Sequence, residues 1–486
     1  MDAHARVPLH KQIYQELREA ILSGRLRAGT QLPPSRDLAK DIGVSRNTVL
    51  CAYQQLLAEG YLEGIVGSGT FVARTLPEDM LQARATTRKS IRQDFTHRQL
   101  SDRGQKLAAA VPKIRDRVFG KPLPFRCATP DYAAFPFEVW ARLVAKYSRN
   151  PSYDLLGYAY PAGHPRLREA VADYLKSARA VRCDAEQVII VPGSQVAFDI
   201  ASQMLLDPGD TVLIEDPGYF GVRGVFARAG LHIAPVPVDA EGISISAIRE
   251  NCDGARLVYV TPSYQFPLGV TMSLARRLEL LEWARQSQAW IIEDDCDGEY
   301  RYAGRPIPSL QGLDGDGRVI YTGTFSKVLF SSLRIGYLVA PPDLVDAFVS
   351  GRVMTDLHSS TIPQAALADF IAEGHFARHL RRMRKLYAGR QTSFVALAKA
   401  QLRGLLEIEE RQAGMHLIGW LPRDVDDVAA ARAASGHNLI TIPLSAFSLR
   451  PLARGALVLG YTAFNEHETQ AAMRSLKIAL SESSAN

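Results

Sequence analysis

Two short apolar runs, residues 319–321 and 335–340, enclose a segment of small hydroxylated residues that holds a single lysine, Lys327. Such runs predict neighbouring strands, and a lysine is costly to bury between strands because its ammonium group loses hydration. Burial lowers the pKa of an amine and makes it a nucleophile that forms a Schiff base with a carbonyl compound. A solvated lysine beside a loop is the ordinary alternative, so the neighbouring residues must decide.

Those neighbours have the chemistry of a phosphate site. Hydroxyl groups and a forked guanidinium bind phosphate, and so do the backbone amides at the start of a helix. The candidates are Thr324, Ser326 and Arg334 close to the lysine, and Gly193, Ser194 and Gln195 between a buried strand and a helix. Many helices start this way without a ligand. A Schiff-base lysine beside a phosphate site is nevertheless typical of pyridoxal 5′-phosphate.

That cofactor also needs an acid against its ring nitrogen. Residues 290–292 form an apolar strand that runs into clustered carboxylates, of which Asp294 is placed to keep the nitrogen protonated. A metal site or a solvated loop is the alternative, but no histidine lies near in sequence. Tyr219 ends another strand-to-loop segment, where an aromatic ring could lie flat on the pyridine.

The order of the predicted elements indicates the fold class. From Phe125 onward apolar strands alternate with amphipathic helices, which is typical of a mostly parallel α/β sheet. Helices are expected over residues 357–373 and 376–397. Short strands near 415–420, 439–443 and 456–461 predict a small C-terminal α/β subdomain.

The first seventy residues follow a different pattern. Apolar residues at every fourth position predict a first helix, Ser35 is the expected N-cap of a second, and a turn at 43–45 leads into a third. Residues 61–72 form a hairpin with a glycine-rich tip. Two short helices joined by a glycine turn, followed by such a hairpin, predict a winged helix-turn-helix that reads the major groove of DNA.

Three motifs in order, Leu-Pro-Pro-Ser-Arg at 32–36, Val-Ser-Arg-Asn-Thr-Val at 44–49 and Gly-Ser-Gly-Thr at 67–70, resemble the GntR-type winged helix. The Lys327 segment together with Asp294 looks like the fold-type I aminotransferases. The whole chain, from about residue 8 to about 470, resembles the MocR/GabR-type transcriptional regulators, which join these two parts. The expected domains are 1–73 (winged helix), 74–122 (basic linker) and 123–480 (cofactor-binding effector domain).

The resemblance implies a role for each matching residue. Lys327 would carry the Schiff base, and no metal site is expected. The cofactor-binding residues would be Gly193, Ser194, Gln195, Tyr219, Asp294, Cys296, Thr324, Ser326, Lys327 and Arg334, and the DNA-binding residues Arg36, Ser45, Arg46, Asn47, Thr48, Gly67, Ser68 and Gly69.

The chain departs from the aminotransferase pattern at three places. Phe266 stands where transaminases have an asparagine, Cys296 where related regulators have a tyrosine, and Val458 where family enzymes have a carboxylate-binding arginine. A thiol is a weak donor, so the cofactor's 3-hydroxyl group would be poorly held. We therefore expect a sensor of an amino acid, an amine or a vitamin B6 compound. The alternatives are an active aminotransferase with an accessory DNA-binding domain, and a DNA-binding protein whose large domain lacks cofactor.

Charge and composition limit the partners. The net charge is +6, and residues 74–121 contain twelve basic against five acidic residues, which suits a segment near a polyanion as well as a solvated tether. No run of about 20 apolar residues and no signal peptide is present, so a cytoplasmic protein is expected. Five scattered cysteines indicate neither disulfides nor zinc. The expected partners are a double-stranded DNA operator, a small effector and a second copy of the chain.

Overall fold

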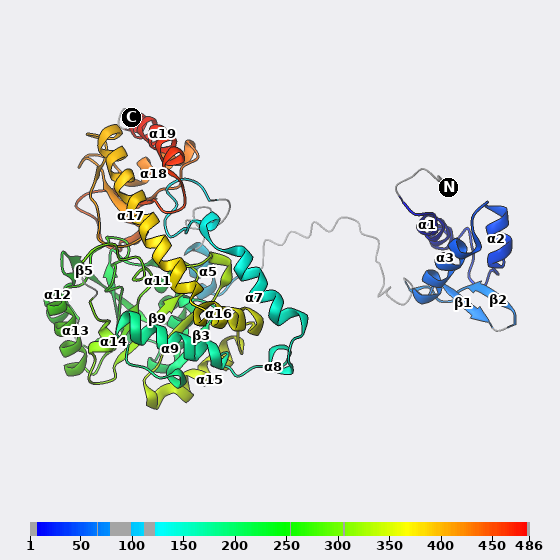
Figure 1. Ribbon diagram of the computed structural model, residues 1–486, viewed down its shortest axis with the longest axis horizontal. Helices are drawn as coiled ribbons and strands as arrows, with labels where there is room; N and C mark the ends of the chain where they lie inside the picture. Colours follow the sequence, from blue (N-terminus) through cyan, green and yellow to red (C-terminus); the bar gives the residue numbers. More distant parts are fainter. Residues whose placement is uncertain are drawn as a thin grey trace. The chain divides into compact units, whose positions relative to one another are not determined.

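The computed structural model describes residues 7–65, 67–77, 99–110, 122–252, 254–304 and 307–483. They belong to two compact units, Met1–Gln99 and Leu100–Asn486, which are described separately (Figure 1). Much of the basic segment expected at 74–122 lies outside the described residues, apart from helix α5, Asp102–Ala110. Its role as a linker therefore stays a prediction.

The N-terminal unit is a winged helix. Helices α1 (Leu9–Leu22), α2 (Ser35–Asp41) and α3 (Arg46–Ala58) precede an antiparallel hairpin of β1 (Leu62–Ile65) and β2 (Gly69–Val72). Its small core is apolar and includes Ile13, Ile21, Val49, Ala52, Tyr53 and Leu56. The spacing of apolar residues predicted these helices, and the fold class is confirmed.

The helix caps show how local chemistry sets the element ends. Ser45 is the N-cap of α3, and its hydroxyl accepts a hydrogen bond from the Thr48 amide at 3.2 Å. The expectation that Ser35 caps α2 is wrong, because Pro34 occupies the cap position and Ser35 is the first helical residue.

An eight-stranded sheet organises the C-terminal unit. Its strand order is β3-β10-β9-β8-β7-β4-β5-β6, and β10 and β6 run antiparallel to their neighbours while the others are parallel. The strands are β3 (Val188–Val191), β4 (Thr211–Asp216), β5 (His232–Asp239), β6 (Gly242–Ile243), β7 (Leu257–Val260), β8 (Trp290–Asp294), β9 (Val319–Thr324) and β10 (Gly336–Val339). The carboxyl ends of β4, β7, β8 and β9 meet at one edge, where open sheets place their ligands.

Helices cover both faces of this sheet, as the buried clusters show. One face packs against α10 (Ser194–Leu205), α11 (Phe220–Ala229) and α15 (Val345–Asp356). The other packs against α12 (Ile245–Asn251) and α13 (Leu274–Gln286), and against α9 (Pro165–Arg179) and α16 (Thr361–Ala372) near β3 and β10. The helix expected from residue 357 begins at Thr361, because Leu357 has a left-handed backbone with φ of 64°.

A small subdomain follows the long helix α17, His375–Gln401. Its antiparallel sheet has the order β11-β12-β14-β13, with β11 (Glu407–Ile408), β12 (His416–Trp420), β13 (Ile442–Pro443) and β14 (Ala456–Gly460). Figure 1 shows α17 running from the large sheet toward α18 (Asp427–Gly436) and α19 (Glu466–Ser483). Within the described parts of the chain, no helix is long and apolar enough to cross a membrane.

Candidate functional site

Lys327 lies just beyond the carboxyl end of β9, beside two groups that define its environment. Its Nζ is 3.6 Å from Asp297 Oδ1 and 5.6 Å from the centre of the Phe266 ring. Its side chain keeps 24% of its possible exposure, so the amine is reachable from the pocket. This position between strand end and aromatic ring suits an amine that meets a small ligand.

The pKa of Lys327 differs from the expectation. Burial by itself lowers this pKa, but Asp297, Cys296 and Asp294 raise it, and the outcome lies well above the ordinary value. The prediction of a lowered pKa is therefore wrong for the protein without cofactor. Nearby carboxylates stabilise the ammonium form, so in the protein without cofactor Lys327 is held protonated and is not yet a nucleophile.

Asp294, the last residue of β8, is 4% exposed, and only one of its two carboxylate oxygens has a hydrogen-bond partner among the described residues. Its Oδ2 accepts a hydrogen bond from the Tyr259 hydroxyl at 2.7 Å, while Oδ1 has no partner among the described residues. Burial raises the pKa of Asp294 to about 6, although Lys327 and Tyr259 oppose the rise. A buried carboxylate oxygen without a donor fits the protonated nitrogen of a pyridine ring.

Residues from three separate segments meet where a phosphate would be held. Gly193 precedes α10 with φ of 137°, and a Cβ there would come within 2.7 Å of the Arg334 guanidinium. Glycine therefore lets the guanidinium lie against the start of α10, where Ser194 is the first helical residue. The Ser326 hydroxyl is buried without a partner among the residues described, and the Ser326 amide donates to Thr324 Oγ1 at 3.2 Å.

A small pocket of about 50 Å³ brings five of the predicted cofactor-binding residues together. The walls of this pocket are Ser194, Tyr219, Tyr259, Thr261, Phe266, Asp294, Cys296 and Lys327. Gln195 reaches the same place, since its Nε2 donates to the Tyr219 hydroxyl at 3.4 Å. The donors, the acid and the amine fit pyridoxal 5′-phosphate, and the individual roles of these residues stay predictions.

Sequence reasoning gave no role to Tyr259, Thr261 or Asp297. The Tyr259 hydroxyl holds Asp294, and Thr261 Oγ1 donates to the buried Glu215 at 2.6 Å. The alternation of side chains along β7 predicts which way Tyr259 and Thr261 point. Their partners, Asp294 and Glu215, depend on the pairing of β7 with β8 and β4. Asp297 was visible as one acid of a cluster, and its closeness to Lys327 depends on the loop after β8.

Two of the three departures from the family pattern, Cys296 and Phe266, line this pocket. Burial raises the pKa of the Cys296 thiol well above its ordinary value although Lys327 opposes it, so the thiol stays protonated. Phe266 contacts Tyr219 and Phe447 edge to face, with ring centres 6.0 and 5.2 Å apart. At these two positions the pocket offers a weak donor and an apolar ring.

In the N-terminal unit the predicted DNA-binding residues lie at the surface. Arg36 is exposed on α2, and Arg46, Asn47 and Thr48 form the first turn of α3. Gly67, Ser68 and Gly69 form the tip of the hairpin. The side-chain Nε2 of Gln31 donates to the Ser68 carbonyl at 2.6 Å and so holds the tip in place. This arrangement suits a recognition helix and a wing, and the individual contacts stay predictions.

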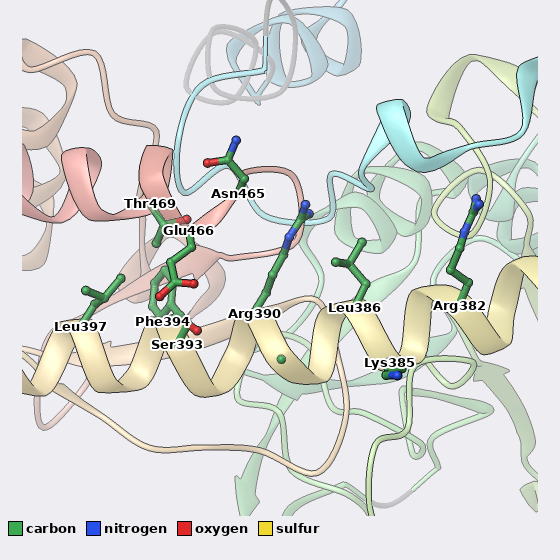
Figure 2. A pocket seen from close by; sticks show the side chains of 11 residues that line it. Arg382, Lys385, Leu386, Arg390, Ser393, Phe394, Leu397, Asn465, Glu466 and Thr469 are labelled. Atoms are coloured by element: carbon green, nitrogen blue, oxygen red, sulfur yellow. The ribbon is translucent and has the colours of Figure 1, made fainter.

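A second hollow of about 620 Å³ lies between α17 and the start of α19 (Figure 2). Arg382, Leu386 and Arg390 rise from the same side of α17, and Asn465 and Glu466 complete the lining. Both arginines are engaged, because Arg382 donates to the Ala134 carbonyl and Arg390 to the Thr462 carbonyl and Asp131. Some basic residues of α17 therefore hold other segments of the C-terminal unit in place.

Known proteins combine the same two parts. The family of bacterial regulatory proteins, gntR family, matches residues 9–72, and aminotransferase class I and II matches residues 128–474. The probable rhizopine catabolism regulatory protein MocR of Rhizobium meliloti is 47% identical over 480 residues, covering 99% of this chain and 95% of that protein. The chain belongs to the MocR-type transcriptional regulators.

Other relatives agree with this membership. The pyridoxine biosynthesis transcriptional regulator PdxR of Corynebacterium glutamicum is 29% identical, covering 91% of this chain and 90% of that protein. The α-aminoadipate aminotransferase LysN of Thermus thermophilus, solved with N-(5′-phosphopyridoxyl)-L-leucine, has a TM-score of 0.72 and 28% identity, covering 78% of this chain and 97% of that one. The chain is thus a DNA-binding transcriptional regulator with an aminotransferase fold, and pyridoxal 5′-phosphate is its cofactor.

Proposed function

We propose that the C-terminal unit senses a small effector, an amino acid, an amine or a vitamin B6 compound, and that this controls DNA binding by the N-terminal unit. The observation that carries the proposal is the pocket in which the Lys327 amine and the unpaired Asp294 Oδ1 face the same small space. An amine and a buried acid that share one pocket are typical of a functional site and not of a purely structural domain.

Each side chain has a defined task in this proposal. Bound pyridoxal 5′-phosphate supplies an aldehyde that amines attack and a ring that withdraws electrons. Lys327 holds the cofactor covalently, and Asp294 keeps a proton on the ring nitrogen through its free oxygen. Arg334, Ser194 and Ser326 bind the phosphate, and Tyr219 packs on the ring.

Control of DNA binding needs a link between the units. We propose that the chain forms a homodimer in the cytoplasm whose two winged helices read two half-sites, with the basic segment 74–122 as the tether. Arg36 and Arg46 contact bases or phosphates, and the tip at 67–69 enters the minor groove. An effector that favours one arrangement of the large units shifts the population of dimers that fit the operator.

One experiment tests the proposal as a whole. Duplexes selected in vitro with the holoprotein provide an operator, and its affinity is measured by fluorescence anisotropy while amines, amino acids and B6 compounds are added. The cofactor absorbance is followed in the same samples. We expect one ligand to change both signals with the same half-saturation. An absorbance change without any change in DNA affinity would refute the sensor, and steady release of a 2-oxo acid would show an aminotransferase instead.

A further inference from the structure

Asp297 is a buried acid with an incomplete set of partners. It is 2% exposed, and neither of its side-chain oxygens accepts a hydrogen bond from the described part of the chain. Its ion-pair partner is Lys327, 3.6 Å away. A buried carboxylate without a cation beside it is costly, so a cationic group of the ligand is favoured next to Asp297 when Lys327 is engaged by the cofactor.

Phe266 gives the pocket an apolar side that is backed by a hydrophobic cluster. Phe266 lines the pocket with its ring under the Lys327 amine, and it belongs to a buried cluster with Ile418, Ile442, Phe447 and Val458. Ile442 and Ile418 are the strand partners of Val458 across β13, β14 and β12, which places the cluster in the middle of the small sheet. A carboxylate against this wall would lose its hydration without gaining a donor.

The nearby arginines are committed to other partners. Arg223 donates to the Phe447 carbonyl, Arg384 to the Glu299 carbonyl, and Arg390 to Asp131. Arg126 is a possible exception and needs a control. Burial raises the pKa of the neighbouring Cys127 thiol to about 11, and Lys327 and Arg126 both oppose that rise, so both cations act on the same thiol.

From this arrangement we infer that the effector is an amine without a carboxylate group, its ammonium drawn by Asp297 and its body packed on the Phe266 wall. The inference rests on the proposed function, because it concerns the ligand of the same pocket. It narrows the effector from amino acids, amines and B6 compounds to amines with an uncharged or cationic body.

Pairs of ligands that differ only by a carboxylate give the test. Phenethylamine with phenylalanine, putrescine with ornithine, and histamine with histidine are titrated into the holoprotein, with the cofactor absorbance and the melting temperature as signals. The same pairs mixed with free pyridoxal 5′-phosphate give the baseline reactivity of each amine. Relative to that baseline, the amine of at least one pair should bind about tenfold or more tightly than its amino acid. A panel in which no amine outcompetes its amino acid overturns the inference.

Variants of the two walls sharpen the result. Asp297→Asn should weaken binding of both members of each pair, and it should bring the preference back to within about twofold of the free-cofactor baseline, since no buried carboxylate then repels the carboxylate of the amino acid. Val458→Arg should move the preference toward the amino acids by about tenfold, because a guanidinium then meets the carboxylate. Val458→Met is the matched control and should keep the wild-type ratio. If Val458→Arg holds cofactor and melts like the control but gains no amino-acid affinity, the apolar wall does not decide the ligand and the inference is wrong.

Failure of this inference can be told apart from failure of the sensor. If the amino acids bind more tightly than the amines in the wild-type protein, and this advantage disappears in Arg126→Gln, then Arg126 holds the carboxylate. That result refutes the ligand class and leaves the sensor standing. An amine that wins but leaves operator affinity unchanged supports the ligand class and refutes the sensor.

Discussion

The two units of this protein carry function in opposite ways. In the winged helix the DNA-contacting candidates, from Arg36 to Gly69, are mostly exposed and close together in sequence, and the core beneath them is apolar. In the C-terminal unit the pocket residues range from Ser194 to Lys327, and they are largely buried. The winged helix carries its functional side chains on the surface of a completed fold, whereas the C-terminal unit carries them largely within its core.

The difference has an energetic consequence. Exposed arginines cost the fold of the winged helix little, so they can be exchanged to read another operator. Burial raises the pKa of Asp294 to about 6, and burial likewise raises that of Glu215 to about 7. Such groups destabilise the unit without cofactor, and a ligand that supplies the missing partner of Asp294 recovers part of that free energy.

Loss of the amine should give the largest effect and should separate the two units most clearly. We expect Lys327→Ala to abolish the visible absorbance and the covalent attachment of cofactor after borohydride reduction, because no other amine lines the pocket as described. DNA affinity without effector should stay within about twofold of wild type. Cofactor that remains reducible onto the variant protein would disprove the assignment of Lys327.

Asp294→Asn tests whether the pocket is destabilising when empty. In the unfolded chain an aspartate titrates near its ordinary pKa, and in the folded protein Asp294 does so at about 6. The folded state thus binds more protons between these values, so the stability of the cofactor-free protein falls as pH rises from about 4 to about 6, by up to about 3 kcal/mol for this group.

Asp294→Asn should remove the part of the pH-dependent loss of stability that Asp294 causes. At pH 7 the cofactor-free variant should melt at a higher temperature than wild type, while the holoprotein should lose cofactor faster in dialysis. Other buried acids, Glu293 among them, titrate in the same direction, so the difference between the two proteins is the quantity to follow. Equal melting temperatures of the two cofactor-free proteins from pH 4 to 7 would show that the carboxylate of Asp294 does not destabilise the fold.

Sequence patterns were most informative where neighbours along the chain also interact. The turn at 43–45 that leads into α3 and the hairpin tip follow from local chemistry, whereas Ser45, the N-cap of α3, was predicted only as part of that turn. The hydrogen bond from Tyr259 to Asp294 depends on the register of β7 and β8, which no local motif reveals. The position of Lys327 at a strand end was foreseen, but the predicted direction of its pKa shift was wrong, because Asp294 at the end of β8 and Cys296 and Asp297 in the loop after it all raise that pKa.

Arg46→Ala should weaken operator binding by about 1–3 kcal/mol if its guanidinium reads a base, and it should leave the absorption spectrum unchanged. In the free protein its Nε donates to the Ser35 hydroxyl at 3.4 Å, a weak contact that DNA can replace. Lys11→Ala, an exposed change on α1, is the control for a general loss of charge. An equal loss in both variants at low salt, vanishing at high salt, would mean that Arg46 contributes only charge.

Cys296→Tyr is the smallest expected change and the finest test of the pocket. The new hydroxyl would replace a weak donor beside Lys327, so the holoprotein should retain cofactor with a gain of about 0.5–1.5 kcal/mol. The measurement is the loss of cofactor absorbance during dialysis, with Cys296→Phe as the control that adds the ring without the hydroxyl. If the tyrosine and phenylalanine variants lose cofactor equally fast, the hydroxyl makes no contact. The weak donor at 296 would then not limit how tightly this regulator holds its cofactor.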